Sequence, residues 1–495
     1  VGWLEGNGKF GYGASSLSTI TNACGIATQY PTCANKYITT YFRKTINIYD
    51  PTAYSGFKIE MLRDDGVVIY VNGIEVLRNN MPSGTITSTT LATSASDNGT
   101  QIISTSLSIA ASHLIAGVNT ISVEVHQTSG NSSDLIWDMR LTGSPVGSTS
   151  LIRGPYIQNV TSASATIRWR TNVPAGGKLL YGTDPNNLNF SNLISTSSVD
   201  HSIQLTGLAA GTKYFYSVET EQNVLQRSEL NYFKTNPVPG TANSYSFWIL
   251  GDPGFNVDNQ LAVRNSFNSS AFRNSINGWI ILGDNAYVSG TDAEYTTGFF
   301  DVYQDTDLAN IPLWSIPGNH EYYATTTARD DLIIDYYNIF DLPVNAEAGG
   351  VASRTESYYS YDYGNIHFVA MDSYGSKYGT MEIADVNSTQ VKWLEQDLAA
   401  NKLPWVVVTF HHPPYSAGSH NSDIEGDLVS IRQNLTPVLE KYGVDLVISG
   451  HSHNYERSKL MKGHTGLEAS FDPNVHNLSS SSGFYDGTAN SCPYV

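Results

Sequence analysis

The sequence predicts a multidomain protein in which two N-terminal all-β sandwiches are followed by an α/β domain. In roughly the first half of the chain, short runs of alternating apolar and polar residues are separated by Gly, Asn, Asp and Ser turns. This is the pattern of β-strands. Beyond residue 237, apolar strands alternate with helical stretches, which is typical of a layered α/β domain. The expected domain boundaries are 1–145, 152–236 and 241–495.

Composition limits the classes of protein to which the chain can belong. With 495 residues, 40% of them hydrophobic and 31 of them tyrosine, the chain can build several packed cores and is not predominantly disordered. The formal net charge of −18 disfavours nucleic-acid binding, because an acidic surface repels phosphate backbones. No apolar run approaches the ~18 residues of a membrane helix. We therefore expect a soluble protein with no nucleic-acid partner and no membrane span.

Composition also predicts a secreted or extracellular protein, or one at the cell surface or in a periplasm. Only 15% of the residues are charged, and Ser, Thr, Asn, Gly and Tyr are abundant. No initiator methionine or signal peptide precedes Val1, so a processing event or an expression boundary is expected there. Cys24 and Cys33 could form a local disulfide in an oxidising compartment, whereas Cys492 is either free or paired outside the chain. Three sequons could carry glycans or could occur by chance: Asn98, Asn131 and Asn387.

The first segment predicts a β-sandwich or jelly roll. Asn72-Gly73 is a strong signal for a two-residue hairpin. The stretch RDDGVVIYVNGIEV at 63–76, with VEVHQ at 123–127, resembles the galactose-binding-like modules of secreted bacterial enzymes. That resemblance implies an attachment role with a glycan or surface ligand, and His126 is expected to be structural. The expected strands are 40–48, 57–62, 67–71, 120–125 and 135–141.

The second segment resembles a fibronectin type III sandwich. Trp169 lies on an alternating strand at 166–170, and the turn before Lys213 leads into tyrosines that alternate with other residues. The resemblance implies that Trp169 lies in the core and that Tyr214 lies at a corner before its strand. Modules of this kind usually serve spacing and docking.

Five apolar strands of the third segment end in residues that can bind metal. Sites in open α/β sheets form at the carboxyl ends of strands, so these side chains are expected to converge. Carboxylate, amide and imidazole donors suit first-row metals and do not form a thiolate zinc site. The strand-end residues are Asp252, Asp284, Asn319 with His320, His411, and His451 with His453, and glycines accompany four of the ends at 251, 283, 318 and 450. Helical stretches are expected at 257–273, 293–307, 330–341, 389–401 and 427–442.

These strand-end blocks occur in the order found in the calcineurin-like metallophosphoesterases, and the version they resemble is that of the purple acid phosphatases. The resemblance spans roughly residues 152–460 and implies an αββα-type catalytic domain. The general family places a histidine two residues after the first aspartate, where Gly254 stands here. Tyr287 follows the second aspartate by three residues, as in the purple enzymes. The blocks are DPG at 252–254, GDNAY at 283–287, GNHE at 318–321, VTFH at 408–411 and GHSH at 450–453.

The resemblance implies a binuclear centre that hydrolyses phosphate esters by attack of a metal-bound hydroxide on phosphorus. A phenolate from Tyr287 is a hard donor suited to ferric iron and would make the protein purple. A trivalent ion acidifies bound water strongly, so hydroxide persists at low pH. The implied ligands of Fe(III) are Asp252, Asp284, Tyr287 and His453. Those of a divalent ion (Zn, Fe or Mn) are Asp284, Asn319, His411 and His451, with Asp284 bridging.

Two histidines are candidates for catalysis. His320 resembles the phosphate-contacting, charge-stabilising histidine of the family. His420, nine residues beyond His411, stands where mammalian-type members place a histidine that binds substrate and can protonate the leaving group. The alternative for His420 is a plain surface histidine.

Other polar residues near the motifs are expected to be structural. His367 is expected to be buried and hydrogen-bonded, and the side chain of His412 is expected to point away from the metals. His464 and His476 receive no role. Orienting hydrogen bonds are expected from Glu321, Asp372, Glu456 and Arg457.

The C-terminal segment departs from the family pattern. The chain ends 42 residues after His453, and the polar stretch from Gly463 to Val495 lacks the further strands that family members carry. Cleavage or truncation is one expectation. The other is that an open sheet edge receives a partner strand or supports self-association.

Three functional hypotheses follow from the sequence. The leading one is a secreted acid phosphatase acting on phosphomonoesters. The second keeps the same site but assigns it phosphodiesters, nucleotides or phytate as substrate. The third is a surface or assembly protein that uses the fold as a scaffold, against which the intact set of metal ligands argues.

Overall fold

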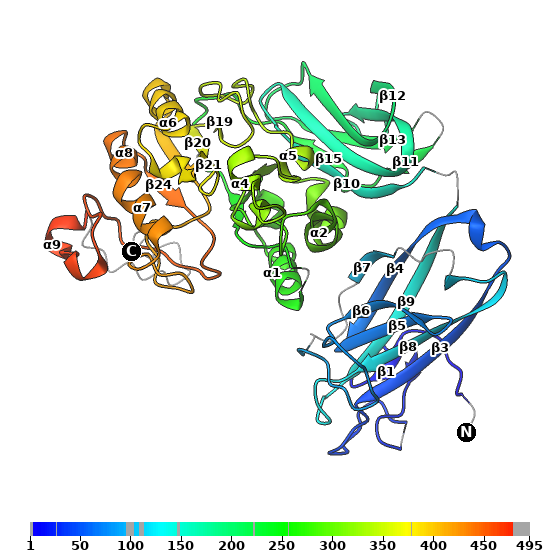
Figure 1. The fold of residues 1–495 in the computed structure, drawn as a ribbon. Coiled ribbons are helices and arrows are strands. Elements are labelled where there is room, and N and C mark those ends of the chain that lie inside the picture. The colour runs from blue at the N-terminus through cyan, green and yellow to red at the C-terminus, as the bar shows by residue number, and fades with distance from the viewer. Residues whose placement is uncertain are drawn as a thin grey trace. The chain divides into compact units, whose positions relative to one another are not determined.

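A computed structural model describes residues 3–25, 27–95, 103–107, 113–145, 149–220, 223–255, 257–377 and 379–478 (Figure 1). The chain divides into two compact units, residues 1–152 with 257–265 and residues 153–256 with 266–495. Among the described residues, no helix has the length and apolarity that crossing a membrane requires. The expectations for Asn98, Cys492 and the last 17 residues lie outside the described parts of the chain.

The first unit is a sandwich of two antiparallel-rich sheets, as the strand pattern predicts. Phe42 of one sheet contacts Phe10 and Trp137 of the other, with ring centroids 5.3 and 6.2 Å apart. The Asn72-Gly73 turn has φ of 51° and 85°, as a two-residue hairpin requires. One sheet has the order β2-β1-β9-β4-β7 and the other β3-β8-β5-β6. The strands are β1 Phe10–Tyr12, β2 Thr19–Ile20, β3 Thr39–Ile48, β4 Tyr54–Asp64, β5 Gly66–Val71, β6 Ile74–Asn79, β7 Ile103–Leu107, β8 Gly117–His126 and β9 Leu135–Pro145.

Two expectations for this unit are confirmed in the structure. Cys24 and Cys33 form a disulfide. His126 is fully buried, and its Nδ1 lies 3.0 Å from Thr39 Oγ1 and 2.8 Å from the main-chain oxygen of Thr90. Because these contacts satisfy the ring nitrogen, His126 is a structural residue.

The second β segment is built around a long hairpin of β11 and β12. Trp169 is buried and stacks on His201 with ring centroids 5.0 Å apart. Tyr214 lies at the start of β13, and its hydroxyl accepts a hydrogen bond of 2.9 Å from the Ala209 amide. The strands are β10 Leu151–Gln158, β11 Ser164–Gly182, β12 Phe190–Thr206, β13 Lys213–Glu219, β14 Val224–Gln226 and β15 Tyr232–Lys234.

This segment does not form a separate sandwich, because its sheet continues into the α/β domain. Strand β10 pairs in parallel with β18 (Leu313–Ser315) (Figure 1). Seven strands of the joint nine-stranded sheet run β14-β13-β11-β10-β18-β17-β16, and the other two join it beside them, β12 on β11 and β15 on β13. Arg153 is buried at this junction and donates to Asp292 Oδ1 at 2.9 Å. The hydroxyl of Tyr156 donates to the Ile339 main-chain oxygen at 2.6 Å.

The α/β domain has two sheets packed face to face. Strands β16 (Phe247–Leu250), β17 (Gly278–Ile281) and β18 are parallel to one another. The second sheet has the order β19-β20-β23-β24. Trp314 stacks on Tyr361 across the interface with ring centroids 3.8 Å apart. The strands of the second sheet are β19 Tyr359–Tyr363, β20 Ile366–Ala370, β23 Trp405–Thr409 and β24 Leu446–Ile448, and a small hairpin is formed by β21 Ser376–Lys377 and β22 Thr380–Met381.

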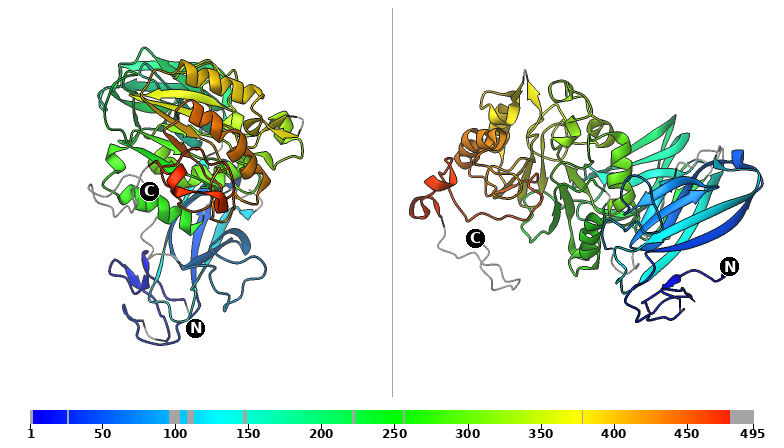
Figure 2. Two further views of the ribbon diagram at one scale, coloured as in Figure 1. Left: turned by 90° about the vertical axis from the view of Figure 1, so that its left-hand side faces the viewer. Right: turned by 60° about the horizontal axis from the view of Figure 1, so that its bottom comes forward.

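Helices cover the outer faces of these sheets and complete an αββα arrangement. Helices α6 to α8 lie along the second sheet, where Leu394 and Ile431 join a core with Val408 (Figures 1 and 2). Phe267 of α1 stacks on Trp248 of the first sheet. The helix expected at 330–341 is two short helices, because Leu332 adopts a left-handed φ of 54° and ends the first. The helices are α1 Asp258–Ser269, α2 Asp292–Glu294, α3 Asp301–Tyr303, α4 Ala328–Asp331, α5 Tyr336–Ile339, α6 Thr389–Ala400, α7 Gly426–Asn434, α8 Thr436–Lys441 and α9 Pro473–His476.

Candidate metal centre

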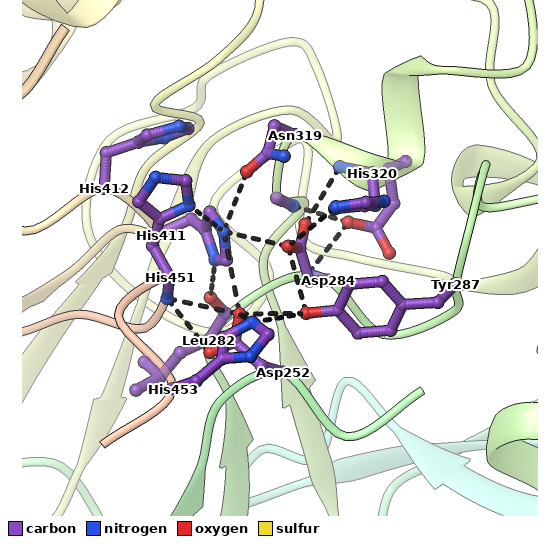
Figure 3. Close-up of polar contacts among 12 residues, drawn as sticks. Asp252, Leu282, Asp284, Tyr287, Asn319, His320, His411, His412, His451 and His453 are labelled. Atoms are coloured by element: carbon purple, nitrogen blue, oxygen red, sulfur yellow. Dashed lines mark hydrogen bonds and ion pairs between the residues drawn. The ribbon is translucent and has the colours of Figure 1, made fainter. Parts of the chain in front are cut away.

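The carboxyl ends of five parallel strands, three from one sheet and two from the other, meet at one edge of the domain. Asp252 follows β16 and Asp284 follows β17, while Asn319 and His320 follow β18. From the second sheet, His411 follows β23, and His451 and His453 follow β24. Figure 3 shows these side chains directed toward one another, with Asp284 at the centre.

One group of donors surrounds the hydroxyl of Tyr287. This oxygen lies 3.1 Å from Asp252 Oδ1, 3.2 Å from Asp284 Oδ2 and 3.1 Å from His453 Nε2. The group contains the four residues predicted to hold the ferric ion, and the structure brings all of them together.

A second group surrounds Nε2 of His411. This nitrogen lies 3.1 Å from Asn319 Oδ1, 3.2 Å from His451 Nδ1 and 3.3 Å from Asp284 Oδ2. All four residues predicted to hold the divalent ion are therefore adjacent. Because Asp284 Oδ2 belongs to both groups, its carboxylate lies where a bridging ligand is required.

The backbone is strained at four of these residues. Asp252, Asp284, His451 and His453 have φ values of 58°, 51°, 71° and 51°. Left-handed conformations are unfavourable for residues with a Cβ and are retained where the surroundings impose them, often at functional sites. One of the glycines beside the ligands, Gly318, has a steric explanation, because a Cβ at this position would lie 2.2 Å from Asp284 Oδ1.

Gly254 also has a steric explanation. A Cβ at this position would lie 2.4 Å from the Cα of Ala286, so a histidine cannot be accommodated without moving that backbone. The Gly254 carbonyl accepts a hydrogen bond of 3.2 Å from the Tyr287 amide. The segment that replaces the usual histidine therefore supports Tyr287 instead.

Hydrogen bonds from outside the donor groups fix their orientation. His411 Nδ1 donates to the Leu282 carbonyl at 2.7 Å, which directs Nε2 toward the other donors. The buried Glu321 carboxylate accepts from the amides of Asp284, Asn285 and Gly318 at 3.0, 2.7 and 2.6 Å. Glu321 thus holds the loops after β17 and β18 together, a larger role than the sequence indicated.

The electrostatics of the groups fit a bound cation. Burial and the carboxylates of Asp252 and Asp284 raise the pKa of the Tyr287 phenol far above its ordinary value. Burial lowers the pKa of His411, but Asp284 and Asp252 outweigh it and raise that pKa to about 10. In the described parts of the chain, no lysine or arginine pairs with either aspartate. Metal ions would neutralise this buried negative charge, and oxygen and imidazole donors suit first-row metals.

A cavity of about 580 Å³ opens over the donor groups and contains both catalytic candidates. His320 Nδ1 donates to the Val288 carbonyl at 2.6 Å, which leaves Nε2 facing the cavity side. His420 stacks on His451 with ring centroids 3.7 Å apart, and its Nδ1 donates to Glu425 at 2.8 Å. His420 therefore lies beside His451, one of the candidate metal ligands. The sequence did not predict its partner Glu425.

The remaining polar residues near the site have structural partners. His412 Nδ1 pairs with Ser373 Oγ at 2.8 Å, and Figure 3 shows its ring outside the network of dashed contacts. Asp372 accepts from Ser357 Oγ at 2.9 Å. Glu456 accepts from Ser416 Oγ at 2.7 Å. Because Ser416 lies in the loop that carries His420, the Glu456 contact orients that loop as expected.

Comparison with known proteins identifies the class of this domain. Residues 245–455 match the calcineurin-like phosphoesterase family, and residues 155–235 match the N-terminal domain of purple acid phosphatases. The domain that contains the site is therefore that of a metal-dependent phosphoester hydrolase. The two matched segments follow one another as an N-terminal purple acid phosphatase domain and a phosphoesterase domain, so this part of the chain is similar to purple acid phosphatases.

Individual relatives agree with this assignment. Purple acid phosphatase 15 of Arabidopsis thaliana is 29% identical over 290 residues, which cover 53% of this chain and 50% of the relative. Tartrate-resistant acid phosphatase type 5 of Mus musculus is 30% identical over 194 residues, covering 35% and 54%. The chain spans about half the length of the curated relatives it matches. The solved structure of PhoD shares the fold, with a TM-score of 0.50, 14% identity and coverage of 64% and 74%.

Proposed function

We propose that the protein is an acid phosphatase that hydrolyses phosphomonoesters at a binuclear centre of Fe(III) and a divalent ion (Zn, Fe or Mn). The observation that carries this proposal is the shared carboxylate of Asp284, which lies 3.2 Å from Tyr287 Oη and 3.3 Å from His411 Nε2. A phenol in one group only makes the two sites unequal, which favours a ferric ion beside a divalent one.

When bound, the two ions would supply Lewis acidity that neutralises phosphate charge and activates water. Asp252, Tyr287 and His453 would hold one ion, Asn319, His411 and His451 the other, and Asp284 both. The small size of Gly318 and the hydrogen bonds of the Glu321 carboxylate hold the loops that carry Asp284 and Asn319 together.

Two histidines of the cavity act on the substrate in this proposal. His320 Nε2 lies 3.9 Å from Asp284 Oδ2, close enough for the imidazole to contact a phosphate oxygen at the centre. Glu425 holds the Nδ1 proton of His420 and so leaves Nε2 to donate a proton to the leaving oxygen. General acid catalysis of this kind contributes about 10²–10⁴-fold.

The cavity wall favours an aromatic leaving group over a polyanionic one. Tyr323, Tyr374 and Leu428 form an apolar side, and Glu425 and Asp427 line the same cavity. The Asp427 carboxylate repels additional phosphate groups, as found in phytate or nucleoside triphosphates, whereas Glu425 is paired with His420. We therefore infer aryl phosphomonoesters as the preferred substrate class rather than phytate or nucleotides.

The first test is metal content and the visible spectrum of protein purified without chelators. We expect about two metals per chain, including iron, and a broad visible band that Tyr287→Phe abolishes. Tyr374→Phe, which alters a cavity tyrosine outside both donor groups, should leave the band unchanged. A colourless protein with two zinc or manganese ions would retain hydrolase chemistry and overturn the iron assignment. Protein that cannot be loaded with metal would favour the scaffold hypothesis.

We also propose that the protein functions outside the cytoplasm. The Cys24–Cys33 disulfide supports this, because such bonds persist in oxidising compartments. Quantifying free thiols before and after denaturation in protein from the native host would test it. Two additional thiols released without reductant would contradict the proposal.

A further inference from the structure

The sandwich of the first unit contains a buried group of oxygen atoms at one end, on residues that belong to neither donor group of the candidate metal centre. Tyr12 ends β1, Asp64 ends β4, Gln127 follows β8 and Asp134 precedes β9. The register brings these ends together, since Tyr12 pairs with Leu135 and Asp64 pairs with Ile136.

Hydrogen bonds tie the same ends to one another. Gln127 Nε2 donates to the main-chain oxygen of Asp134 at 2.9 Å, which places the amide head of Gln127 beside Asp134. Thr128 donates from its amide and its hydroxyl to Asp65 Oδ2 at 2.8 and 3.0 Å. The two aspartates that end β4 are thereby held against the end of β8.

Three buried oxygens of this group have no hydrogen-bond partner. They are Asp64 Oδ2, Gln127 Oε1 and Tyr12 Oη, on residues that are 2%, 0% and 1% exposed. Gln127 Oε1, and Asp64 Oδ2 when its carboxylate is ionised, can only accept, so what they lack is a donor or a cation. Buried acceptors without partners are rare in folded proteins and call for an explanation.

The charges around Asp64 indicate which partner is missing. Burial and the carboxylates of Asp134 and Asp65 raise the pKa of Asp64 to about 9. Arg63 donates to the main-chain oxygen of Asp65 and to Asn79, and no described contact joins it to the Asp64 carboxylate. A positive ion at the cluster would relieve the repulsion among the three carboxylates and satisfy both acceptors.

We propose that this end of the sandwich binds one calcium ion through Asp64, Asp134 and Gln127, with the Tyr12 hydroxyl beside it. The donors are carboxylate and amide oxygens, with no sulfur or imidazole among them, and such sets select hard cations. Calcium tolerates irregular oxygen coordination, and water or main-chain carbonyls complete its shell, whereas magnesium demands near-octahedral geometry. Because the site lies in the first unit, the proposal is independent of the phosphatase chemistry.

The test uses the full chain and terbium(III), a luminescent substitute for calcium that a nearby tyrosine sensitises. We expect terbium emission on excitation of tyrosine, with a component that millimolar calcium displaces and magnesium does not. Asp64→Asn should remove this component. Glu60→Gln, which changes another carboxylate of strand β4, should retain it. Asp284→Asn should also retain it, and this variant separates the new site from the metal centre that contains Tyr287.

Calorimetry gives a second readout that does not depend on luminescence. Calcium should raise the melting temperature of one transition by about 4 °C or more at saturation, and EGTA should reverse the rise. Asp64→Asn should melt at the same temperature with and without calcium. If calcium neither displaces terbium from the wild-type chain nor shifts any transition, the cluster is satisfied by protons or water and the proposal is wrong.

Discussion

The buried ion pair network at His367 predicts a pH-dependent stability of the α/β domain. His367 lies on β20, where Nδ1 is 2.7 Å from Asp362 Oδ1 and Nε2 is 2.8 Å from Asp397 Oδ2. Burial lowers the pKa of His367, but the hydrogen bonds to both aspartates outweigh it and raise that pKa to about 9. The imidazolium is therefore the form that the fold stabilises.

The sign and size of the effect follow from linkage. The unfolded histidine titrates near its ordinary value of 6.5, so the stabilisation is complete below about pH 6.5. It is lost as pH rises through about 9, where the folded imidazolium loses its proton. A shift of roughly 2.5 pKa units corresponds to about 3 kcal/mol in the free energy of unfolding.

Urea unfolding of the wild type and of His367→Gln, followed by tryptophan fluorescence, measures this effect. Glutamine can still hydrogen-bond to one aspartate but does not titrate. The stability difference between the two proteins should shrink by about 3 kcal/mol between pH 6 and pH 9.5. His113→Gln, at a histidine of the first unit, serves as a control that should not show this change. A wild-type-minus-variant difference that stays constant across this range would refute the reasoning.

Three further predictions concern the site and the junction beside it. Glu321→Gln should weaken metal affinity by about 10–100-fold, measured by chelator competition, whereas a merely local role would leave affinity unchanged. Arg153→Met should lower the free energy of unfolding by about 2 kcal/mol, because it removes a buried hydrogen-bond donor. The loss is limited because Arg170 still pairs with Asp292 at 2.6 Å. An unchanged urea midpoint would contradict this. Asp427→Asn should raise kcat/KM for phytate several-fold and leave that for phenyl phosphate unaltered, and equal changes for both substrates would show that the carboxylate does not discriminate.

Local patterns in the sequence predicted five strands of the first unit and the strand ends at which the candidate metal ligands lie, whereas the full ligand set, including Tyr287, came from the family resemblance. Each candidate ligand lies within a few residues of the end of a strand, and parallel strands bring their carboxyl ends to one edge. In the sequence, Gly318 was only part of a motif. The structure shows why a glycine is needed there, because a Cβ would collide with the Asp284 carboxylate. The αββα layering came from the family resemblance and not from the strand pattern itself.

Features that depend on distant partners were not predictable. The charge state of His367 is set by Asp397, 30 residues away on α6, and nothing in the strand sequence reveals that partner. The cluster at Asp64, Gln127 and Asp134 forms only when three strand ends meet. Likewise, the sequence shows that Glu425 lies five residues after His420, but their hydrogen bond depends on the conformation of the loop between them.

The junction of β10 with β18 has a consequence for how the chain folds during synthesis. Gln158 and its partner Leu313 are about 155 residues apart, so at ~5–20 residues per second the ribosome needs on the order of 10–30 s to deliver β18 after β10. During this interval β10 can rest only on the hairpin of β11 and β12, with its other edge unpaired. Unpaired strand edges recruit other chains. We therefore expect nascent chains halted before residue 313 to expose the free edge of β10 and to be more prone to associate than the complete chain.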